Sequence, residues 1–314
     1  MRAIAIDAFG GRDRLQLRDL PRPKPSRGEI LIHVVAAGVN PVDWKIREGL
    51  LKDAFPHAFP LIPGWEAAGV VEELGEGTQR LRKGDRVWTY ARKPVVQGGT
   101  YAEYVAVPES CCGLMPANLL FEEAAGVPLA GLTAWQELRR AGVTKGTTVL
   151  VHASAGGVGH FAVQLARHLG ARVVGTAGPS NQEFVLAQGA EASIDYTRDD
   201  FVEAVRLRFP GGVDVVLDHV GGETLERSFS ALRPGGVVVG IVEPPDPERA
   251  RAAGVRAEYV FVEPDADQLQ IFASLAERKA LRPQIRKIFP LHDAAAAHEA
   301  SESGHTRGKL VLAL

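Results

Sequence analysis

A glycine-rich turn between a strand and a helix is the feature that most constrains the fold of this chain. Residues 149–153 form a short apolar-rich run, and residues 154–159 read Ser-Ala-Gly-Gly-Val-Gly. Apolar side chains then recur at three- and four-residue spacing, which is typical of an amphipathic helix, and a second apolar run follows at 171–176. A strand, a glycine turn, a helix and a second strand at this spacing predict a Rossmann βαβ unit that binds a dinucleotide.

The residues of this turn suit the phosphates of such a cofactor. Gly156 lets the backbone approach the pyrophosphate, and Gly159 lets the helix pack closely on the sheet. The helix N-terminus offers free N–H groups and the positive end of the helix dipole. The predicted contacts are Ser154, Ala155, Gly156, Gly157, Val158 and Gly159. Ser154 stands where the usual motif has glycine, and a turn that merely joins strand to helix is the alternative interpretation.

The end of the second strand lacks the acidic residue of an NAD site. That acid binds the ribose 2′-hydroxyl about 20 residues past the glycines, and here Ala177 lies at or near its position. An acid would repel a 2′-phosphate, so its absence and the hydroxyls of Thr176 and Ser180 favour NADPH. The loop has no Arg or Lys, and Tyr196 and Arg198 are the nearest candidates for further contacts. A solvated surface charge is the alternative for Arg198.

The pattern of strands and helices changes along the chain. The first 110 residues read mostly as short strands separated by Gly and Pro, with one short helix expected at Pro41–Gly49. From about Phe121 strands alternate with helices, which indicates a parallel sheet. A helix at Asp265–Lys279, a strand, another helix and a last strand complete the chain. Residues 243–254, rich in Pro and charge, are predicted to be a surface loop.

Composition and charge exclude several classes of protein. A net charge of -2 gives no electrostatic footprint for nucleic acid or an anionic membrane, and no apolar run is long enough to span a bilayer. Cys111 and Cys112 are neighbours, so the chain does not depend on a disulfide framework. With no secretion signal evident at the N-terminus, we expect a cytoplasmic protein.

Many motifs occur in the order found in one superfamily. The sequence resembles the medium-chain dehydrogenase/reductase superfamily, in its zinc-free quinone oxidoreductase branch, over its whole length. The matching segments are AAGVNPVDWKIREG (36–49), PLIPGWEAAGVVEELGEG (60–77), KGDRVW (83–88), GGTYAEYVAVP (98–108), GVPLAGLTAWQEL (126–138), HASAGGVG (152–159), VLDHVGGETL (216–225) and GKLVLAL (308–314).

The resemblance implies an α/β protein of two domains. Residues 1–118, completed by 264–314, would form a GroES-like, β-rich catalytic domain. Residues 119–263 would form a Rossmann domain with a doubly wound parallel sheet that binds NADPH. The resemblance also implies a homodimer or a higher homo-oligomer, commonly paired through the last Rossmann strand near Glu258–Val262.

The residues that hold zinc in other members of the superfamily are missing. Those members have a Cys in the segment that here contains Asn40, and Gly-His-Glu where this chain has Gly64-Trp65-Glu66. The structural-zinc lobe is also absent, because residues 90–100 contain no Cys. Catalytic zinc polarises a carbonyl or an alkoxide. We therefore predict no metal, and hydride transfer from NADPH to quinones or α,β-unsaturated carbonyls rather than alcohol oxidation.

Three residues near the first short helix are the predicted catalytic group. Lys45 stands where many quinone reductases have tyrosine, as it does in enone and alkenal reductases with the motif Asn-Pro-Val-Asp-Trp-Lys. Its ammonium would stabilise a developing enolate oxygen; a surface lysine is the alternative. Asn40 and Asp43 would contact the nicotinamide ribose or fix Lys45, and helix capping is their alternative.

The resemblance adds further cofactor contacts. These are Thr133, Val220, Gly240, Ile241, Val242 and Lys309, beside Asn40. His219 follows Asp218, but adjacent strand residues point to opposite faces, so we interpret His219 as lining the end of a strand rather than forming a catalytic dyad.

Two other functions stay open at this point. One is reduction of enoyl thioesters, which would need a basic entrance for the phosphates of coenzyme A, and no basic cluster is evident. The other is a protein that binds NADPH with little turnover, because binding and catalysis are separate properties of a fold.

Overall fold

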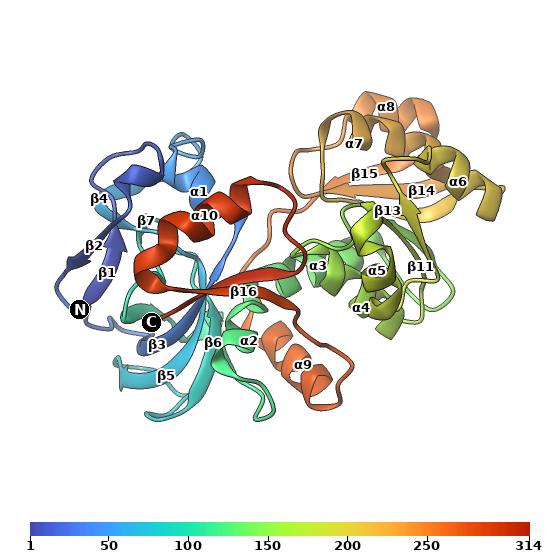
Figure 1. Cartoon of the computed structure of the whole chain (residues 1–314). Coiled ribbons are helices and arrows are strands. Elements are labelled where there is room, and N and C mark those ends of the chain that lie inside the picture. Colours follow the sequence, from blue (N-terminus) through green and yellow to red (C-terminus); the bar gives the residue numbers. More distant parts are fainter. The chain divides into compact units, whose positions relative to one another are not determined.

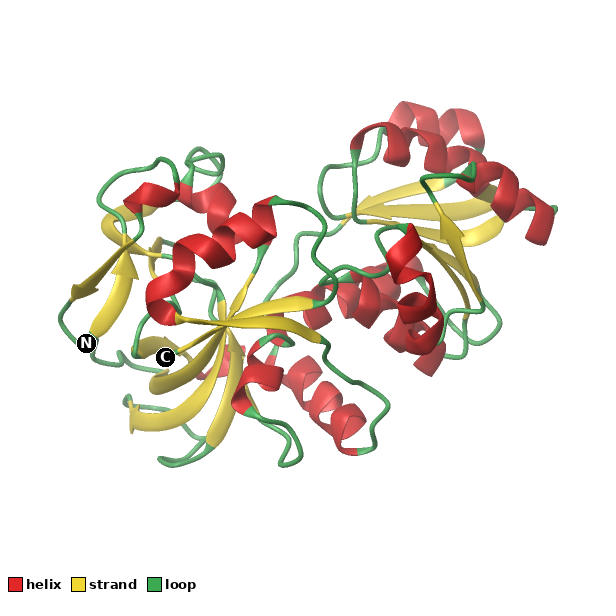
Figure 2. Ribbon diagram, in the orientation of Figure 1, coloured by secondary structure: helices red, strands yellow, loops and turns green.

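The computed structural model describes residues 1–314, which divide into two compact units. The first unit comprises Met1–Leu132 and Pro264–Leu314, and the second comprises Thr133–Glu263. The first boundary falls later than residue 118, where the sequence analysis placed it. The reason is that α2 (Phe121–Ala125) packs on strands of the first unit, and α3 (Pro128–Ala141) begins there. Each unit is a separate α/β assembly (Figures 1 and 2).

The first unit is built on a mixed sheet that joins the two ends of the chain. Its strand order is β16 (Ile285–Pro290), β17 (Lys309–Ala313), β3 (Glu29–Val39), β5 (Glu66–Leu74), β6 (Arg86–Tyr90) and β9 (Cys112–Leu114), with β8 (Tyr104–Pro108) also paired to β3. The central contact is antiparallel, with Leu310 of β17 opposite Val39 of β3. The C-terminal strand therefore completes a sheet begun by the N-terminal part of the chain, as the red and blue segments of Figure 1 show.

Smaller elements surround this sheet. They are two-stranded pairs of β1 (Arg2–Ala5) with β2 (Gln16–Asp19) and of β4 (His57–Ile62) with β7 (Val96–Gly98), the helices α1 (Pro41–Arg47), α9 (Ala266–Glu277) and α10 (Ala294–Glu302), and the 3₁₀ turns η1 (Arg12–Arg14), η2 (Glu109–Cys111) and η5 (Leu291–Asp293). The helix expected at Pro41–Gly49 is α1. It ends before Gly49, whose φ of 79° is a left-handed conformation that favours glycine.

The second unit is a six-stranded parallel sheet with helices between its strands. The strand order is β12 (Ala192–Asp195), β11 (Arg172–Ala177), β10 (Thr148–Val151), β13 (Val213–Asp218), β14 (Leu232–Gly240) and β15 (Arg256–Tyr259). The connecting helices are α4 (Gly159–His168), α5 (Gln182–Gln188), α6 (Phe201–Arg208), α7 (Gly222–Ser228) and α8 (Pro247–Ala253), with 3₁₀ turns η3 (Pro179–Asn181) and η4 (Phe229–Ala231). In chain order the strands run 3-2-1-4-5-6, which is the doubly wound order of a Rossmann sheet.

The prediction that residues 243–254 form a surface loop is wrong over most of that segment. Residues Pro247–Ala253 form α8. Asp246 caps this helix by accepting hydrogen bonds from the N–H groups of Glu248 and Arg249, and Gly254 ends it with a φ of 65°. Asp before Pro at the first helical position, with Gly after the last turn, is a helix signal that the charge and proline content concealed.

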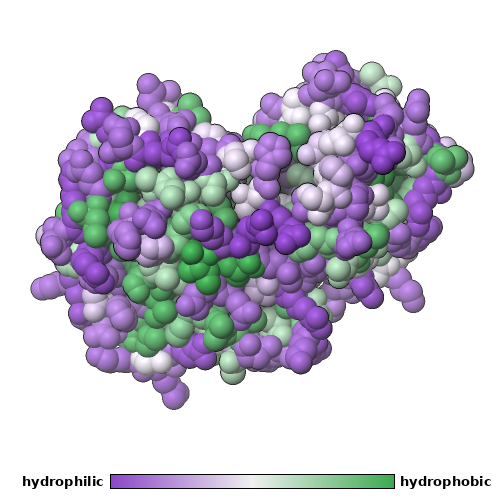
Figure 3. Space-filling view, in the orientation of Figure 1, coloured by the Kyte–Doolittle hydropathy of each residue, from purple (hydrophilic) through white to green (hydrophobic).

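Each unit has its own hydrophobic core. The core of the first unit includes Ile4, Ile32, Val87 and Leu312, and that of the second includes Leu150, Val174, Val216 and Val238. No helix in the chain combines the length and the hydropathy needed to cross a membrane. On the face drawn in Figure 3, hydrophilic residues are interspersed with smaller hydrophobic areas.

Candidate active site

The glycine turn predicted from the sequence lies between β10 and α4. Gly156, Gly157 and Val158 are half-buried, whereas Ser154, Ala155 and the first residue of α4 are buried. A Cβ on Gly159 would lie 2.2 Å from the carbonyl oxygen of Ala153, which no side chain can tolerate. Glycine is therefore required at position 159 so that the helix can approach the turn closely.

The N-terminus of α4 fits the pyrophosphate of a dinucleotide. Val158 precedes the helix and no side chain caps its first turn. The leading N–H groups of a helix have no partner within the helix. Here the N–H of His160 bonds to the carbonyl oxygen of Gly156, which leaves those of Gly157, Val158 and Gly159 beside the turn. Ser154 serves the turn itself, because its hydroxyl donates a hydrogen bond of 2.9 Å to the carbonyl oxygen of Thr176. The backbone, rather than the Ser154 side chain, is what the structure leaves for phosphate.

Residues predicted near the 2′-phosphate fall into two groups. Thr176 is buried and its hydroxyl lies 3.1 Å from His152 Nδ1, so it faces the interior. Ser180 and Arg198 are exposed, and Tyr196 is 54% exposed with its hydroxyl beside Gly178. The exposed group lies at the carboxyl ends of β11 and β12, where open parallel sheets bind ligands. Of these four residues, Thr176 alone has a hydroxyl already bonded within the protein, to His152.

In the first unit, Asn40, Glu66 and Lys309 form a buried polar cluster. Lys309 Nζ lies 2.7 Å from Glu66 Oε1 and also donates to Asn40 Oδ1. Asn40 Nδ2 donates to the same Glu66 oxygen at 2.7 Å, and the N–H of Leu129 donates to Glu66 Oε2 at 2.7 Å. The side chains of Lys309 and Glu66 are 2% and 0% exposed. The Lys309 ammonium is thus held by Glu66, a counter-ion that the sequence analysis did not identify.

Asp43 caps α1 and does not contact Lys45. It accepts hydrogen bonds from the N–H of Asn40 at 2.8 Å and from the hydroxyl of Tyr101 at 3.1 Å. Burial raises the pKa of Asp43 to about 7, although both hydrogen bonds oppose the rise. Its second oxygen, Oδ1, is buried without a partner. The capping alternative is therefore what the structure shows for Asp43, and Lys45 is not fixed by it.

A chain of hydrogen bonds connects α1 with α10. Arg47 Nη1 lies 3.2 Å from His298 Nδ1, and His298 Nε2 lies 3.3 Å from the Tyr101 hydroxyl, which bonds to Asp43. A guanidinium only donates, so His298 Nδ1 accepts and Nε2 carries the proton. Burial, with the nearby Arg47 charge, lowers the pKa of His298 to about 3, so the ring stays neutral. This chain holds α1 in place from inside the unit.

Lys45 lies on α1 with its ammonium available to a ligand. The side chain is half-buried and makes no hydrogen bond or ion pair; its Nζ lies 5.7 Å from the centre of the Trp44 ring. Its neighbours Asp43 and Ile46 point into the protein, where they are buried. An ammonium without a counter-ion is able to stabilise a developing negative charge.

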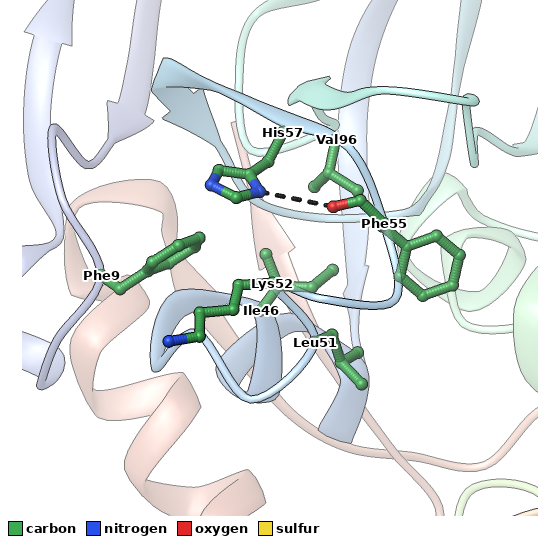
Figure 4. Close-up of a pocket in the computed structure, with 7 residues that line it drawn as sticks. All are labelled: Phe9, Ile46, Leu51, Lys52, Phe55, His57 and Val96. Carbon is green, nitrogen blue, oxygen red and sulfur yellow. Dashed lines mark hydrogen bonds between the residues drawn. The ribbon is translucent and has the colours of Figure 1, made fainter.

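A small apolar pocket lies beside α1 (Figure 4). It is lined by Phe9, Ile46, Leu51, Lys52, Phe55, His57 and Val96. The ring centres of Phe9 and His57 lie 4.7 Å apart with the ring planes tilted by 58°, and His57 Nδ1 lies 3.4 Å from the carbonyl oxygen of Phe55. Its volume of about 10 Å³ is at the lower limit for one water molecule. The pocket is therefore a packing gap beside the helix rather than space for a quinone.

The remaining predicted cofactor contacts lie in the second unit. Thr133 is buried on α3, and Gly240 is buried at the end of β14. Val220 and Val242 are 48% and 43% exposed at the ends of neighbouring strands, with Ile241 half-buried between Gly240 and Val242. Two apolar side chains exposed at the carboxyl edge of a parallel sheet are consistent with a ligand surface.

The partner of His219 is Glu137, which no motif in the sequence indicates. His219 Nε2 lies 2.9 and 3.0 Å from the two carboxylate oxygens of Glu137, and the two side chains are 5% and 0% exposed. Asp218 turns away and accepts from the N–H groups of Val220 and Gly221. Asp218 and His219 thus form no dyad, as the strand geometry predicts. Glu137 gave no signal in the sequence, because it lies far from His219 along the chain.

No group of three or more His, Cys, Asp or Glu side chains is arranged to hold a metal ion. At the two positions compared with zinc ligands, Asn40 bonds to Glu66 and Lys309, and the Trp65 ring is buried.

Comparison with known proteins identifies the class. A family model described as "Alcohol dehydrogenase GroES-like domain" matches residues 26–117, and one described as "Zinc-binding dehydrogenase" matches residues 188–312. The chain is 34% identical to the NADPH-dependent alkenal/one oxidoreductase, chloroplastic, of Arabidopsis thaliana, over 99% of this chain and 79% of that protein.

Solved structures agree with this class. The quinone oxidoreductase of Coxiella burnetii is 37% identical with a TM-score of 0.90, covering 100% of this chain and 99% of the other. The Escherichia coli quinone oxidoreductase complexed with NADPH is 29% identical with a TM-score of 0.88, covering 100% of both chains. This chain belongs to the quinone oxidoreductase branch of the medium-chain dehydrogenase/reductase superfamily. Its fold is the expected pair of a GroES-like unit and a Rossmann unit.

Proposed function

We propose that this protein is an NADPH-dependent reductase of quinones or α,β-unsaturated carbonyls. The observation that carries the proposal is the uncapped N-terminus of α4 beside the glycine turn, with no acid at Ala177, in a chain of this family. The relatives named above as NADPH-dependent, or solved with NADPH, support the choice of cofactor. Bound NADPH would supply a hydride.

The chain's own residues would bind and orient the reactants. Backbone N–H groups at Gly157–Gly159 would hold the pyrophosphate. Gly156 lies beside them, and its own N–H donates to the carbonyl oxygen of Ala153 at 2.9 Å. Tyr196, Ser180 and Arg198 would meet the 2′-phosphate, while Thr133, Val220 and residues 240–242 would contact the nicotinamide. Lys45 would donate a hydrogen bond to the substrate oxygen as charge develops there. Asn40, Asp43 and Lys309 act by fixing the start of α1 and the adjacent strands.

Metal independence is part of the proposal. Asn40 is an amide already engaged with Glu66 and Lys309, and the indole of Trp65 is not a zinc ligand. Hydride acceptors of this kind need less activation than a ketone, so an ammonium replaces the metal as the group that stabilises the oxygen.

A substrate panel tests the function. Purified protein is mixed with NADPH and a quinone, an enone or an enoyl thioester, with and without a metal chelator, and the nicotinamide absorbance is followed. We expect NADPH oxidation with quinones or enones, unchanged by the chelator. Turnover with enoyl thioesters alone would identify the alternative reductase, and binding of NADPH without turnover of any acceptor would contradict the proposed activity.

Ala177→Asp is expected to reverse the preference for NADPH over NADH. A carboxylate at the end of β11 would accept a hydrogen bond from a ribose hydroxyl but repel a 2′-phosphate. Dissociation constants of both cofactors are measured for parent and variant by fluorescence titration. Ala187→Asp, at an exposed position of α5, is the control for an added charge. Equal affinity of the parent for the two cofactors would be evidence against this assignment.

We also propose a homodimer formed through β15. This strand is the edge of the parallel sheet and pairs only with β14. Tyr259 and Phe261 at its end are each 38% exposed, and an edge with apolar side chains favours pairing with a second copy. Neither Cys111 nor Cys112 is in a disulfide, which supports the proposal of a reducing compartment such as the cytoplasm.

A further inference from the structure

The buried pair of Glu137 and His219 lies where three elements of the second unit meet. Glu137 belongs to α3, and His219 directly follows β13. Both carboxylate oxygens of Glu137 lie within 3.0 Å of His219 Nε2. The pair therefore connects a helix to the carboxyl end of a central strand by a contact that excludes water.

The third element at this junction is β10, which takes part through the backbone of His152, the residue directly after the strand. The N–H of His152 donates a 3.0 Å hydrogen bond to the carbonyl oxygen of Leu217, which ties the end of β10 to β13. Its carbonyl is close enough to His219 to raise the pKa of that ring. His152 lies two residues before Ser154, where the glycine turn begins, so the junction adjoins the proposed pyrophosphate site.

The surroundings of His219 favour its charged form. Burial lowers the pKa of His219, but Glu137, Asp218 and the His152 carbonyl together raise it above its ordinary value. His219 Nδ1 forms no hydrogen bond of normal geometry. Glu137 is thus the main group that stabilises the positive charge of His219. Loss of its carboxylate would also remove the hydrogen bonds that hold the His219 ring in place.

Each member of the Glu137–His219 pair lies next to one proposed nicotinamide contact. Thr133 precedes Glu137 by four residues and so lies one turn away on the same side of α3. Val220 follows His219 and is exposed at the edge of the sheet. A restraint between Glu137 and His219 therefore fixes the separation of Thr133 from Val220.

We propose that Glu137 and His219 are positioning residues that set the width of the nicotinamide site, a role that rests on the proposed function. Stability alone does not explain a buried ion pair, because apolar side chains of similar volume often stabilise a fold just as much. A role in placing the two nicotinamide contacts, Thr133 and Val220, would explain why the buried position holds charged side chains rather than apolar ones. Neither Glu137 nor His219 touches the cofactor in this role.

Affinities for a whole and a half cofactor test the inference. The ligand 2′,5′-ADP carries the adenosine half of NADPH, including its 2′-phosphate, but no nicotinamide. In Glu137→Leu, the dissociation constant of NADPH is expected to rise about tenfold, equivalent to about 1.4 kcal/mol, while that of 2′,5′-ADP changes less than about twofold. NADPH binding is followed by nicotinamide fluorescence, and 2′,5′-ADP by calorimetry.

Two further variants guard against a general loss of structure. His219→Gln keeps a donor toward Glu137, so it should fold and show the same split at a smaller size. Asp214→Asn is the matched control at the opposite end of β13, where Asp214 accepts hydrogen bonds from the N–H and hydroxyl of Thr148. It should lower thermal stability and leave the ratio of the two affinities unchanged.

The outcomes separate this inference from the proposed function. Folded Glu137 and His219 variants that weaken both ligands equally, or neither, would overturn the positioning role while the parent still reduces quinones or enones. A parent protein that binds 2′,5′-ADP but not NADPH would overturn both.

Discussion

Lys45→Ala is expected to lower kcat for enone reduction by about 100- to 1,000-fold, the usual cost of losing one donor to a developing oxyanion. Lys45 has the required properties in the structure: it is half-buried, on a helix held from within, and without a counter-ion. The interaction forms mainly as charge develops on the substrate oxygen, so kcat should fall more than KM rises. Steady-state kinetics with saturating NADPH measures this.

The same variant should distinguish two classes of substrate. A reduced quinone oxygen is intrinsically more stable than an enolate and needs less from a donor, so quinone reduction should lose less than enone reduction. Dissociation constants for NADPH should change little, because the proposed pyrophosphate site at Gly156–Gly159 belongs to the other unit. Lys45→Arg, which keeps a cationic donor of different shape, should recover part of the loss.

A lysine on the surface of the same unit is the matched control. Lys83 is exposed and its ammonium lies 3.6 Å from Glu72, so Lys83→Ala should retain normal kinetics. If Lys45→Ala matched Lys83→Ala on enones, Lys45 would be an ordinary surface lysine, and the oxygen would have to be stabilised by the backbone or by solvent.

The fold could be predicted from the sequence because its strongest signals are local. The glycine turn with its flanking strand and helix defines the first βαβ unit, and regular alternation after Phe121 extends it to the doubly wound sheet. The role of the chain ends in the first sheet came from the family resemblance. Alternation of polar and apolar residues alone does not say that β17 pairs with β3, since that contact joins distant segments.

The sequence predicted the backbone path of the candidate site, but not which side chains pair with one another there. The turn at 154–159 lies where expected because glycine content and spacing determine its path. Lys309 and Glu137 differ in this respect, since their partners Glu66 and His219 lie far away in the sequence. Whether a lysine meets a ligand or a carboxylate depends on strand register, which becomes known only when the sheet is assembled.

Lys309→Met is expected to lower the free energy of unfolding of the first unit by about 3–5 kcal/mol, the usual cost of removing one partner from a buried ion pair. Methionine nearly matches the apolar stem of lysine, so packing is largely retained. Glu66 would keep two donors, Asn40 Nδ2 and the Leu129 N–H, but its buried negative charge would have no counter-ion, and Asn40 Oδ1 would lose its donor. Urea unfolding followed by tryptophan fluorescence measures the loss.

A double-mutant cycle of Lys309→Met, Glu66→Gln and the two together separates the contribution of the charges from that of packing. Glu66→Gln with Lys309→Met removes both charges and should recover much of the stability lost by Lys309→Met alone, because a neutral amide is far less costly to bury than a lone carboxylate. Glu248→Gln is the surface control: its ion pair with Arg251 is 75% and 71% exposed, so the change should stay within about 0.5 kcal/mol. Equal losses for Lys309→Met and Glu248→Gln would mean that the buried cluster contributes no more than a surface pair. If the double variant were less stable than Lys309→Met, the hydrogen bonds of the buried cluster, rather than its charges, would hold the start of α1.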